Sequence, residues 1–190
     1  MMLKRREAVK RLLADRGDLL VVTGLGAPTY DVAAAGDSAL NFYLWGAMGS
    51  AAMVGLGLAQ AWPSSRIAVI TGDGEMLMGL GSLATIGVKQ PKNLCIVVID
   101  NRHYGETGMQ ASHTDAGIDL VAVAKACRFG EAHLVDSDSG IDEARILLHR
   151  GDGPSFIQVR VEAVDEPRVI PLRDGHEIKL RFMQALAELK

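Results

Sequence analysis

Two apolar segments rich in β-branched residues, 67–70 and 94–99, each run directly into a polar turn. Short apolar runs of this kind are typical of strands buried inside a sheet. The turns that follow them read Thr71-Gly72-Asp73-Gly74-Glu75 and Asp100-Asn101-Arg102-His103-Tyr104-Gly105. Because ligands bind beyond the carboxyl ends of the strands in an open α/β sheet, we expect both turns to contribute to one binding site.

Strand-like and helix-like patterns alternate along the whole chain. We expect strands at residues 19–22, 42–44, 67–70, 94–99, 132–135 and 155–161. We expect helices over residues 3–15, after Gly49, after Asp73, over 119–128, from Ser139 and over 175–188. This alternation is typical of an α/β fold, here a three-layer parallel sheet with helices on both faces. With 190 residues and no linker or repeat, we expect a single domain over residues 1–190.

The connections are predicted from turn-forming residues. Residues 27–29 are interpreted as a turn, and residues 102–117 as a long polar loop. Gly79 and Gly81 are expected inside the helix that follows Asp73, where close packing would explain them. The order of the strands across the sheet does not follow from this pattern.

The composition excludes several classes of protein. A hydrophobic fraction of 48% with 5% aromatic residues predicts a folded, aliphatic interior. A net charge of -3 gives no indication of a nucleic-acid partner. The apolar stretch 51–62 is shorter than the about 20 residues that a membrane span needs, and residues 4–13 lack the features of a secretory signal. Cys95 and Cys127 form no Cys-x-x-Cys pair, so we expect buried, reduced thiols in a cytoplasmic protein.

The two turns carry the groups that a metal-bound diphosphate needs. Gly72 and Gly74 let the main chain approach phosphate oxygens, and the helix after them presents free N–H groups. Asp73 offers a hard anionic oxygen for Mg²⁺, Asn101 an amide oxygen and His103 a backbone carbonyl. The cofactor-binding residues that we expect from the two turns are Gly72, Asp73, Gly74, Glu75, Asn101, Tyr104 and Gly105.

Two other glycine patterns fit a phosphate site less well. Residues 151–153 also read Gly-Asp-Gly, but they follow a predicted helix and precede a proline, so they are interpreted as a helix stop. A nicotinamide-binding turn at residues 24–26 lacks its third glycine and is interrupted by Pro28. The diphosphate interpretation of residues 72–74 is therefore favoured.

Residues 72–101 resemble the thiamine diphosphate signature, in which Gly-Asp-Gly and a spacer precede an Asn pair or Asp-Asn. The resemblance extends over almost the whole chain, because residues 42–49, 81–85, 100–108 and 179–183 are similar to segments of sulfopyruvate and phosphonopyruvate decarboxylases. More narrowly, the chain resembles the β-type subunit that contains only their diphosphate-binding domain. This resemblance implies a thiamine-diphosphate-binding fold.

The resemblance also implies roles for individual residues. Asp73, Asn101 and the His103 carbonyl would hold Mg²⁺. The Gly46 carbonyl would accept a hydrogen bond from the aminopyrimidine ring of thiamine diphosphate, and Met48 would support the bent cofactor from below.

By the same resemblance, the reaction is decarboxylation of a small 2-oxo acid. His103 and His113 are the candidate catalytic proton carriers of this chain. The glutamate that activates the cofactor would come from a separate pyrimidine-binding subunit, so we expect a composite, heteromeric active site together with self-association.

The chain departs from the family in the second turn. Glu106 stands where a small hydroxyl residue is usual, and Arg102-His103 where Ser or Thr often follows the Asn. A glutamate there would repel a sulfonate or phosphonate, which leaves the third group of the substrate open. The alternatives are a carboligase or oxidoreductase subunit that uses the same cofactor, or a non-catalytic cofactor-binding module.

Overall fold

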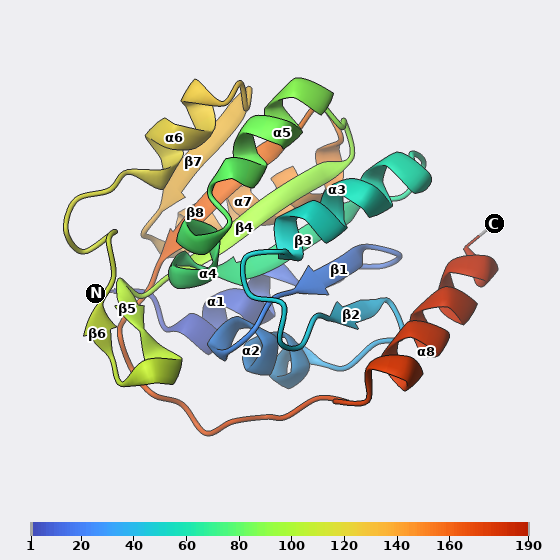
Figure 1. Ribbon diagram of the computed structural model, residues 1–190, viewed down its shortest axis with the longest axis horizontal. Coiled ribbons are helices and arrows are strands. Elements are labelled where there is room, and N and C mark those ends of the chain that lie inside the picture. Colours follow the sequence, from blue (N-terminus) through green and yellow to red (C-terminus); the bar gives the residue numbers. More distant parts are fainter. Residues whose placement is uncertain (1, 190) are drawn as a thin grey trace.

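A computed structural model describes residues 2–189 and contains a six-stranded parallel sheet (Figure 1). The strands are β1 (Leu20–Thr23), β2 (Asn41–Tyr43), β3 (Ile67–Gly72), β4 (Leu94–Asp100), β7 (Glu131–Val135) and β8 (Ser155–Arg160). Their order across the sheet is β2-β1-β3-β4-β8-β7, and neighbouring strands are parallel. The prediction of a parallel α/β sheet is therefore confirmed.

Helices cover both faces of this sheet (Figure 1). They are α1 (Arg5–Leu12), α2 (Ala27–Ala35), α3 (Ala51–Ala61), α4 (Asp73–Met78), α5 (Gly81–Lys89), α6 (Leu120–Ala126), α7 (Asp138–Arg150) and α8 (Gly175–Glu188). Side chains of α1, α2 and α7 share one apolar core with Ile70 and Val97. Side chains of α3, α4, α5 and α6 share a second core with Val69 and Val98. Alternate residues of β3 and β4 thus enter opposite cores, which explains why both strands are apolar throughout.

The strand order creates a switch point at β1. The chain runs from β1 outward to β2 and then returns to the other side of β1 to form β3. In doubly wound sheets, a crevice for ligands opens where neighbouring connections diverge in this way. The turn after β3 therefore begins beside such a crevice, a placement that the sequence pattern did not predict.

Two of the predicted connections differ from the observed ones. Residues 27–29 form the first turn of α2, with Pro28 at its start, rather than a separate turn. Proline is tolerated there because the first N–H groups of a helix have no partner within it. The loop 102–117 contains a hairpin of β5 (His103–Tyr104) and β6 (Gln110–Ala111), joined by the 3₁₀ turn η1 (Gly105–Thr107) and the two residues after it.

The prediction that Gly79 and Gly81 lie inside one helix is wrong. Gly79 ends α4 and Gly81 begins α5. A Cβ atom at Gly79 would lie 2.1 Å from the carbonyl oxygen of Gly49, so the glycine permits a close backbone approach. The helix stop predicted at residues 151–153 is confirmed, because Gly151 follows α7 with a φ of +81°.

Residues 162–174 form an extended arm between β8 and α8 (Figure 1). The arm is fixed to the N-terminal part of the chain by side-chain donors. Arg5 Nη1 donates to the Val164 carbonyl at 3.1 Å, and Trp45 Nε1 donates to the Leu172 carbonyl at 2.9 Å. Within residues 2–189, no helix is both long and apolar enough to cross a membrane.

The two cysteines differ in environment. Cys95 is buried in β4, as expected, and burial raises the pKa of its thiol to about 12. Cys127 follows α6 and is only partly buried, so the expectation of a fully buried second thiol is wrong.

Candidate functional site

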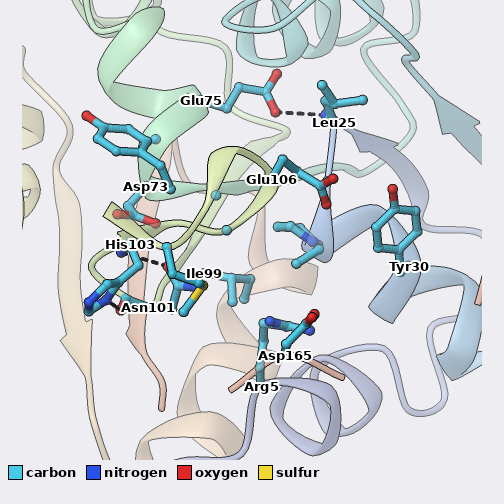
Figure 2. A pocket seen from close by; sticks show the side chains of 18 of the residues that line it. Arg5, Leu25, Tyr30, Asp73, Glu75, Ile99, Asn101, His103, Glu106 and Asp165 are labelled. Atoms are coloured by element: carbon cyan, nitrogen blue, oxygen red, sulfur yellow. Dashed lines mark hydrogen bonds between the residues drawn. The ribbon is translucent and has the colours of Figure 1, made fainter. Parts of the chain in front are cut away.

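The two polar turns meet at one rim of the sheet. Gly72 of β3 is paired with Ile99 of β4, so Asp73 follows one residue after this pair and Asn101 two residues after it, at the ends of neighbouring strands. Both residues line a cavity of about 180 Å³. Figure 2 shows Asp73, Asn101 and His103 on one side of this cavity, with Arg5, Tyr30 and Asp165 on another. The structure thus brings together the residues predicted to bind Mg²⁺.

Asp73 is the first residue of α4 and only 2% exposed. Its Oδ2 accepts a hydrogen bond from Ser112 Oγ at 2.5 Å. Burial raises the pKa of its carboxyl to about 6, the neighbouring Asp100 adds to the rise, and the hydrogen bond from the Ser112 hydroxyl opposes it. An anionic carboxylate is therefore costly here without a cation.

Asp100 lies buried next to the site and holds several of its neighbours by hydrogen bonds. It is fully buried, and it accepts hydrogen bonds from Gln158 Nε2 at 2.6 Å, Thr114 Oγ1 at 2.8 Å and the Arg102 amide at 2.9 Å. Thr114 Oγ1 also lies 3.3 Å from Asp73 Oδ2, but its single proton serves the nearer carboxylate. Ser112, Thr114 and Gln158 were missed by sequence reasoning, because isolated hydroxyl residues in a polar loop and a single amide within an apolar strand carry no distinctive spacing.

Asn101 and His103 form a tight turn. Asn101 Oδ1 accepts a hydrogen bond from the His103 amide at 3.0 Å, and His103 Nδ1 donates to the Asn101 carbonyl at 2.9 Å. Arg102 between them has a φ of +63°, in the left-handed region that few residues adopt readily. The Asn101 amide oxygen and the backbone of His103 are therefore held by local contacts at the cavity.

The glycines of the first turn play different parts. A Cβ atom at Gly74 would lie 2.7 Å from Cδ1 of Tyr104, so only glycine fits beneath that ring without a shift. A Cβ atom at Gly72 would meet nothing closer than 3.7 Å. The free approach of a ligand to the Gly72 backbone stays a prediction. The helix after the turn, α4, has only six residues, so its dipole is small.

Glu75 is 4% exposed and also lines the cavity. Its Oε2 accepts a hydrogen bond from the Leu25 amide at 3.1 Å (Figure 2). The same oxygen accepts one from Thr71 Oγ1 at 2.9 Å, and Oε1 accepts one from the Gly49 amide at 3.2 Å. Burial raises the pKa of this carboxyl, and the hydrogen bonds oppose the rise. The carboxylate thus contacts three separate segments of the chain.

The predicted cofactor contacts of the 44–50 loop are split by the structure. Met48 lines the cavity and is 40% exposed. Gly46 is exposed with a φ of +73°, and it does not line the cavity that the described residues form. The structure therefore brings Met48, but not Gly46, to the cavity lined by the described residues.

The two candidate proton carriers are also placed differently. His103 lines the cavity. His113 is exposed, and within the described part of the chain it is not a lining residue. It reaches the cavity only through Tyr104, whose hydroxyl forms a hydrogen bond of 2.6 Å with His113 Nδ1. Tyr104 and Gly105 line the cavity as predicted for cofactor-binding residues.

An ion pair that sequence reasoning missed borders the far side of the cavity. Arg168 of the arm lies 3.3 Å from Glu106 and 5.6 Å above the ring of Tyr30. All three residues line the cavity. Glu106 is therefore paired with the guanidinium of Arg168. The pattern of residues 102–117 could not indicate this pair, because Arg168 lies 62 positions further along the chain.

The oxygen donors fit a hard divalent cation. One carboxylate, one amide oxygen and a backbone carbonyl leave room for diphosphate oxygens and water in a six-coordinate Mg²⁺ site. Residues 2–189 contain no cluster of three or more His, Cys, Asp or Glu side chains that could hold a metal alone. The donor set therefore suits a cation that a ligand helps to bind.

Comparisons with known proteins show the family of the chain. Residues 24–159 match the family described as thiamine pyrophosphate enzyme, C-terminal TPP binding domain, where thiamine pyrophosphate is another name for thiamine diphosphate. The chain is 41% identical to sulfopyruvate decarboxylase subunit beta of Methanothermobacter thermautotrophicus, covering 97% of this chain and 96% of that protein. It is 38% identical to phosphonopyruvate decarboxylase of Streptomyces viridochromogenes, covering 94% of this chain but only 45% of that protein.

The fold also matches solved structures. Benzoylformate decarboxylase from Polynucleobacter necessarius superimposes with a TM-score of 0.72 over 88% of this chain and 34% of that one, at 17% identity. At that identity the match concerns the fold alone. The chain belongs to the thiamine pyrophosphate enzyme family, and residues 24–159 correspond to the domain that these enzymes carry as their C-terminal TPP-binding domain.

Proposed function

We propose that this chain is the diphosphate-binding subunit of a heteromeric, Mg²⁺-dependent 2-oxo acid decarboxylase. The observation that carries the proposal is the convergence of Asp73 and Asn101 on one cavity at the rim of the sheet. The near-complete overlap with a relative named sulfopyruvate decarboxylase subunit beta supports the choice of reaction.

The metal would be held by Asp73, Asn101 and the backbone carbonyl of His103. Burial makes the Asp73 carboxylate unfavourable without a cation, which supports the assignment of a metal to this residue. The diphosphate would lie along the backbone of Gly72, where an added Cβ atom would meet nothing closer than 3.7 Å, whereas the ring of Tyr104 occupies that space at Gly74.

Thiamine diphosphate, when bound, would supply a thiazolium ring that accepts the electron pair released as CO₂ leaves the substrate. The residues of this chain bind and orient the reactants. Leu25, Ile99 and Met48 give the cavity apolar walls, which would exclude water around the charge-dispersing step. His103 at the cavity, and His113 through the Tyr104 hydroxyl, are the groups that could carry a proton to the product.

A partner chain with a pyrimidine-binding domain would supply the activating glutamate. Two observations support this step. Met48 is partly exposed at the surface of the cavity, and the Streptomyces relative, which is named as a decarboxylase without a subunit designation, is about twice as long as the matched region. Self-association of the resulting assembly belongs to the same proposal and can be measured by light scattering.

Ligand-dependent thermal stability tests the cofactor part of this proposal. Thiamine diphosphate with Mg²⁺, at about 100 times its dissociation constant, should raise the melting temperature of the chain by about 5–10 °C, and NAD should not. Asp73→Ala should abolish the rise. Asp152→Ala, in the exposed second Gly-Asp-Gly turn, is the matched control and should keep it. Stabilisation by NAD alone would contradict the proposal.

Activity tests the subunit part. The chain alone should decarboxylate 2-oxo acids very slowly, and addition of the pyrimidine-domain partner should restore turnover. Rapid turnover by the chain alone would contradict the composite site. Cofactor binding without decarboxylation in the assembled complex would favour a carboligase, an oxidoreductase or a non-catalytic module.

A further inference from the structure

Glu75 lies two positions after Asp73, but its carboxylate contacts other parts of the chain. Each of the donors that reach it comes from a different segment: the Leu25 amide from the β1–α2 turn, Thr71 Oγ1 from the end of β3, and the Gly49 amide from the loop before α3. A buried carboxylate that accepts several hydrogen bonds fixes the positions of its donors. Glu75 therefore joins two walls of the cavity to the start of α4.

The Gly49 contact fixes the loop that carries Met48. Gly49 has a φ of +87°, and its amide donates to Glu75 Oε1 at 3.2 Å. From the other side, the Gly49 carbonyl approaches Gly79 so closely that a Cβ atom there would lie 2.1 Å away. The backbone next to Met48 is thus held between the Glu75 carboxylate and the break between α4 and α5.

The turn after β1 packs against the same carboxylate. A Cβ atom at Gly24 would lie 1.4 Å from Glu75 Oε2, so the space that a side chain would take is filled by the glutamate. The adjacent Leu25 amide then donates to that oxygen. Any residue other than glycine at position 24 would displace Glu75 and, through it, the Gly49 loop.

We propose that Glu75 is a positioning residue that holds Met48 against the cavity, so that it controls binding of the organic rings of the cofactor rather than of its diphosphate. This inference rests on the proposed function, because it takes the ligand to be thiamine diphosphate. Glu75 acts through Gly49 and Met48, whereas Asp73 and Asn101 act on the metal and the diphosphate.

Glu75→Gln is the most direct test of this role. The substitution keeps the size of the side chain but replaces one acceptor oxygen with an NH₂ donor, which would face N–H or O–H donors. At least one of the hydrogen bonds from Leu25, Thr71 or Gly49 is lost. Glu177→Gln is the matched control, because Glu177 is likewise the third residue of its helix but is exposed.

Affinities for two ligands distinguish a positioning role of Glu75 from a general structural role. Calorimetry with thiamine diphosphate plus Mg²⁺, and with inorganic pyrophosphate plus Mg²⁺, should give different results for Glu75→Gln. Affinity for thiamine diphosphate should fall roughly tenfold or more, whereas affinity for pyrophosphate should change less than about threefold. Met48→Ala should show the same selective loss, and Asp73→Asn should lose both ligands.

A second variant keeps the test informative if Glu75→Gln does not fold. Gly79→Ala would push the Gly49 carbonyl from the opposite side, so it should reproduce the selective loss while Glu75 stays intact. Equal losses for both ligands, or no loss for either, would overturn the positioning role while the wild-type protein still binds thiamine diphosphate. Failure of the wild-type protein to bind either ligand would overturn the proposed function and this inference with it.

Discussion

The ring of Tyr104 lies directly over Gly74, so close that a Cβ atom at position 74 would be 2.7 Å from Cδ1 of the ring. This contact ties the first polar turn to the hairpin of the second. Gly74→Ala should therefore push the hairpin outward and weaken binding of thiamine diphosphate roughly tenfold, measured by calorimetry. Gly81→Ala, where an added Cβ atom meets nothing within 4 Å, should leave binding unchanged.

A double-mutant cycle checks the cause of that loss. Tyr104→Ala removes the ring that an alanine at position 74 would contact. The loss of thiamine diphosphate affinity caused by Gly74→Ala should therefore be smaller in the Tyr104→Ala background than in the wild type. An equal loss of affinity in both backgrounds would show that the ring contact is not the reason for the glycine.

Asp73 should make the ligand-free protein less stable at neutral pH. Its pKa in the folded state, about 6, lies above the ordinary value of 3.8, so the folded state holds the proton more tightly than the unfolded state. Stability from this group is then fully present at low pH and is lost as pH rises from about 4 through 6. Asp73→Asn should raise the free energy of unfolding by about 3 kcal/mol at pH 7.5.

The pH dependence of that gain is the decisive measurement. In urea unfolding of the ligand-free protein, the difference between Asp73→Asn and wild type should shrink as the pH falls through 6 and 4, and it should approach zero only well below 3.8, where the carboxyl is protonated in both states. Asp152→Asn, on the exposed turn, should change stability by less than about 0.5 kcal/mol at either pH. A constant difference across the pH range would contradict the raised pKa.

Thr114 should stabilise the site through its hydroxyl. Thr114→Val keeps the shape of the side chain but removes the donor that lies 2.8 Å from the buried Asp100 carboxylate. The variant should lose about 1–3 kcal/mol of stability, and Thr114→Ser should recover most of it. Thr107→Val, in the exposed part of the same loop, is the control and should lose less than about 0.5 kcal/mol in denaturant titrations.

The pair of Glu106 with Arg168 should influence the choice of substrate in the assembled enzyme. Glu106→Gln would leave Arg168 free to attract a second anionic group, so kcat/KM for sulfopyruvate should rise about three- to fivefold relative to pyruvate. Arg168→Gln should have the opposite effect. Arg173→Gln, whose guanidinium lies over Trp45, is the control and should leave the ratio unchanged. An unchanged ratio in all three variants would place this pair outside the substrate site.

The rim of the sheet could be predicted from sequence because two apolar runs of strand length end in polar, glycine-containing turns. A short run of β-branched and other apolar residues is suited to few structures besides a strand buried on both faces. Residues 67–70 and 94–99 form such strands, as expected. The common edge of Asp73 and Asn101 followed from the parallel arrangement alone.

Other parts of the site depend on contacts between distant segments and could not be predicted in the same way. The ends of α4 and α5 are determined by the close approach of Gly49 to Gly79, which no local propensity records. The hydroxyl of Ser112 reaches Asp73 only because the loop after β4 folds back over α4. The resemblance implies a role for Gly46, and the position of His113 in the loop 102–117 makes it a candidate proton carrier, but within residues 2–189 neither lines the cavity.

The cavity has walls from the first and last parts of the described chain, since Arg5 of α1 and Arg168 of the arm both border it. A pocket with such remote walls exists only after global folding is complete. Occupancy of the pocket should therefore be coupled to the cooperative unfolding of the entire domain, and a bound ligand should slow proteolytic cleavage within the arm as well as near α1.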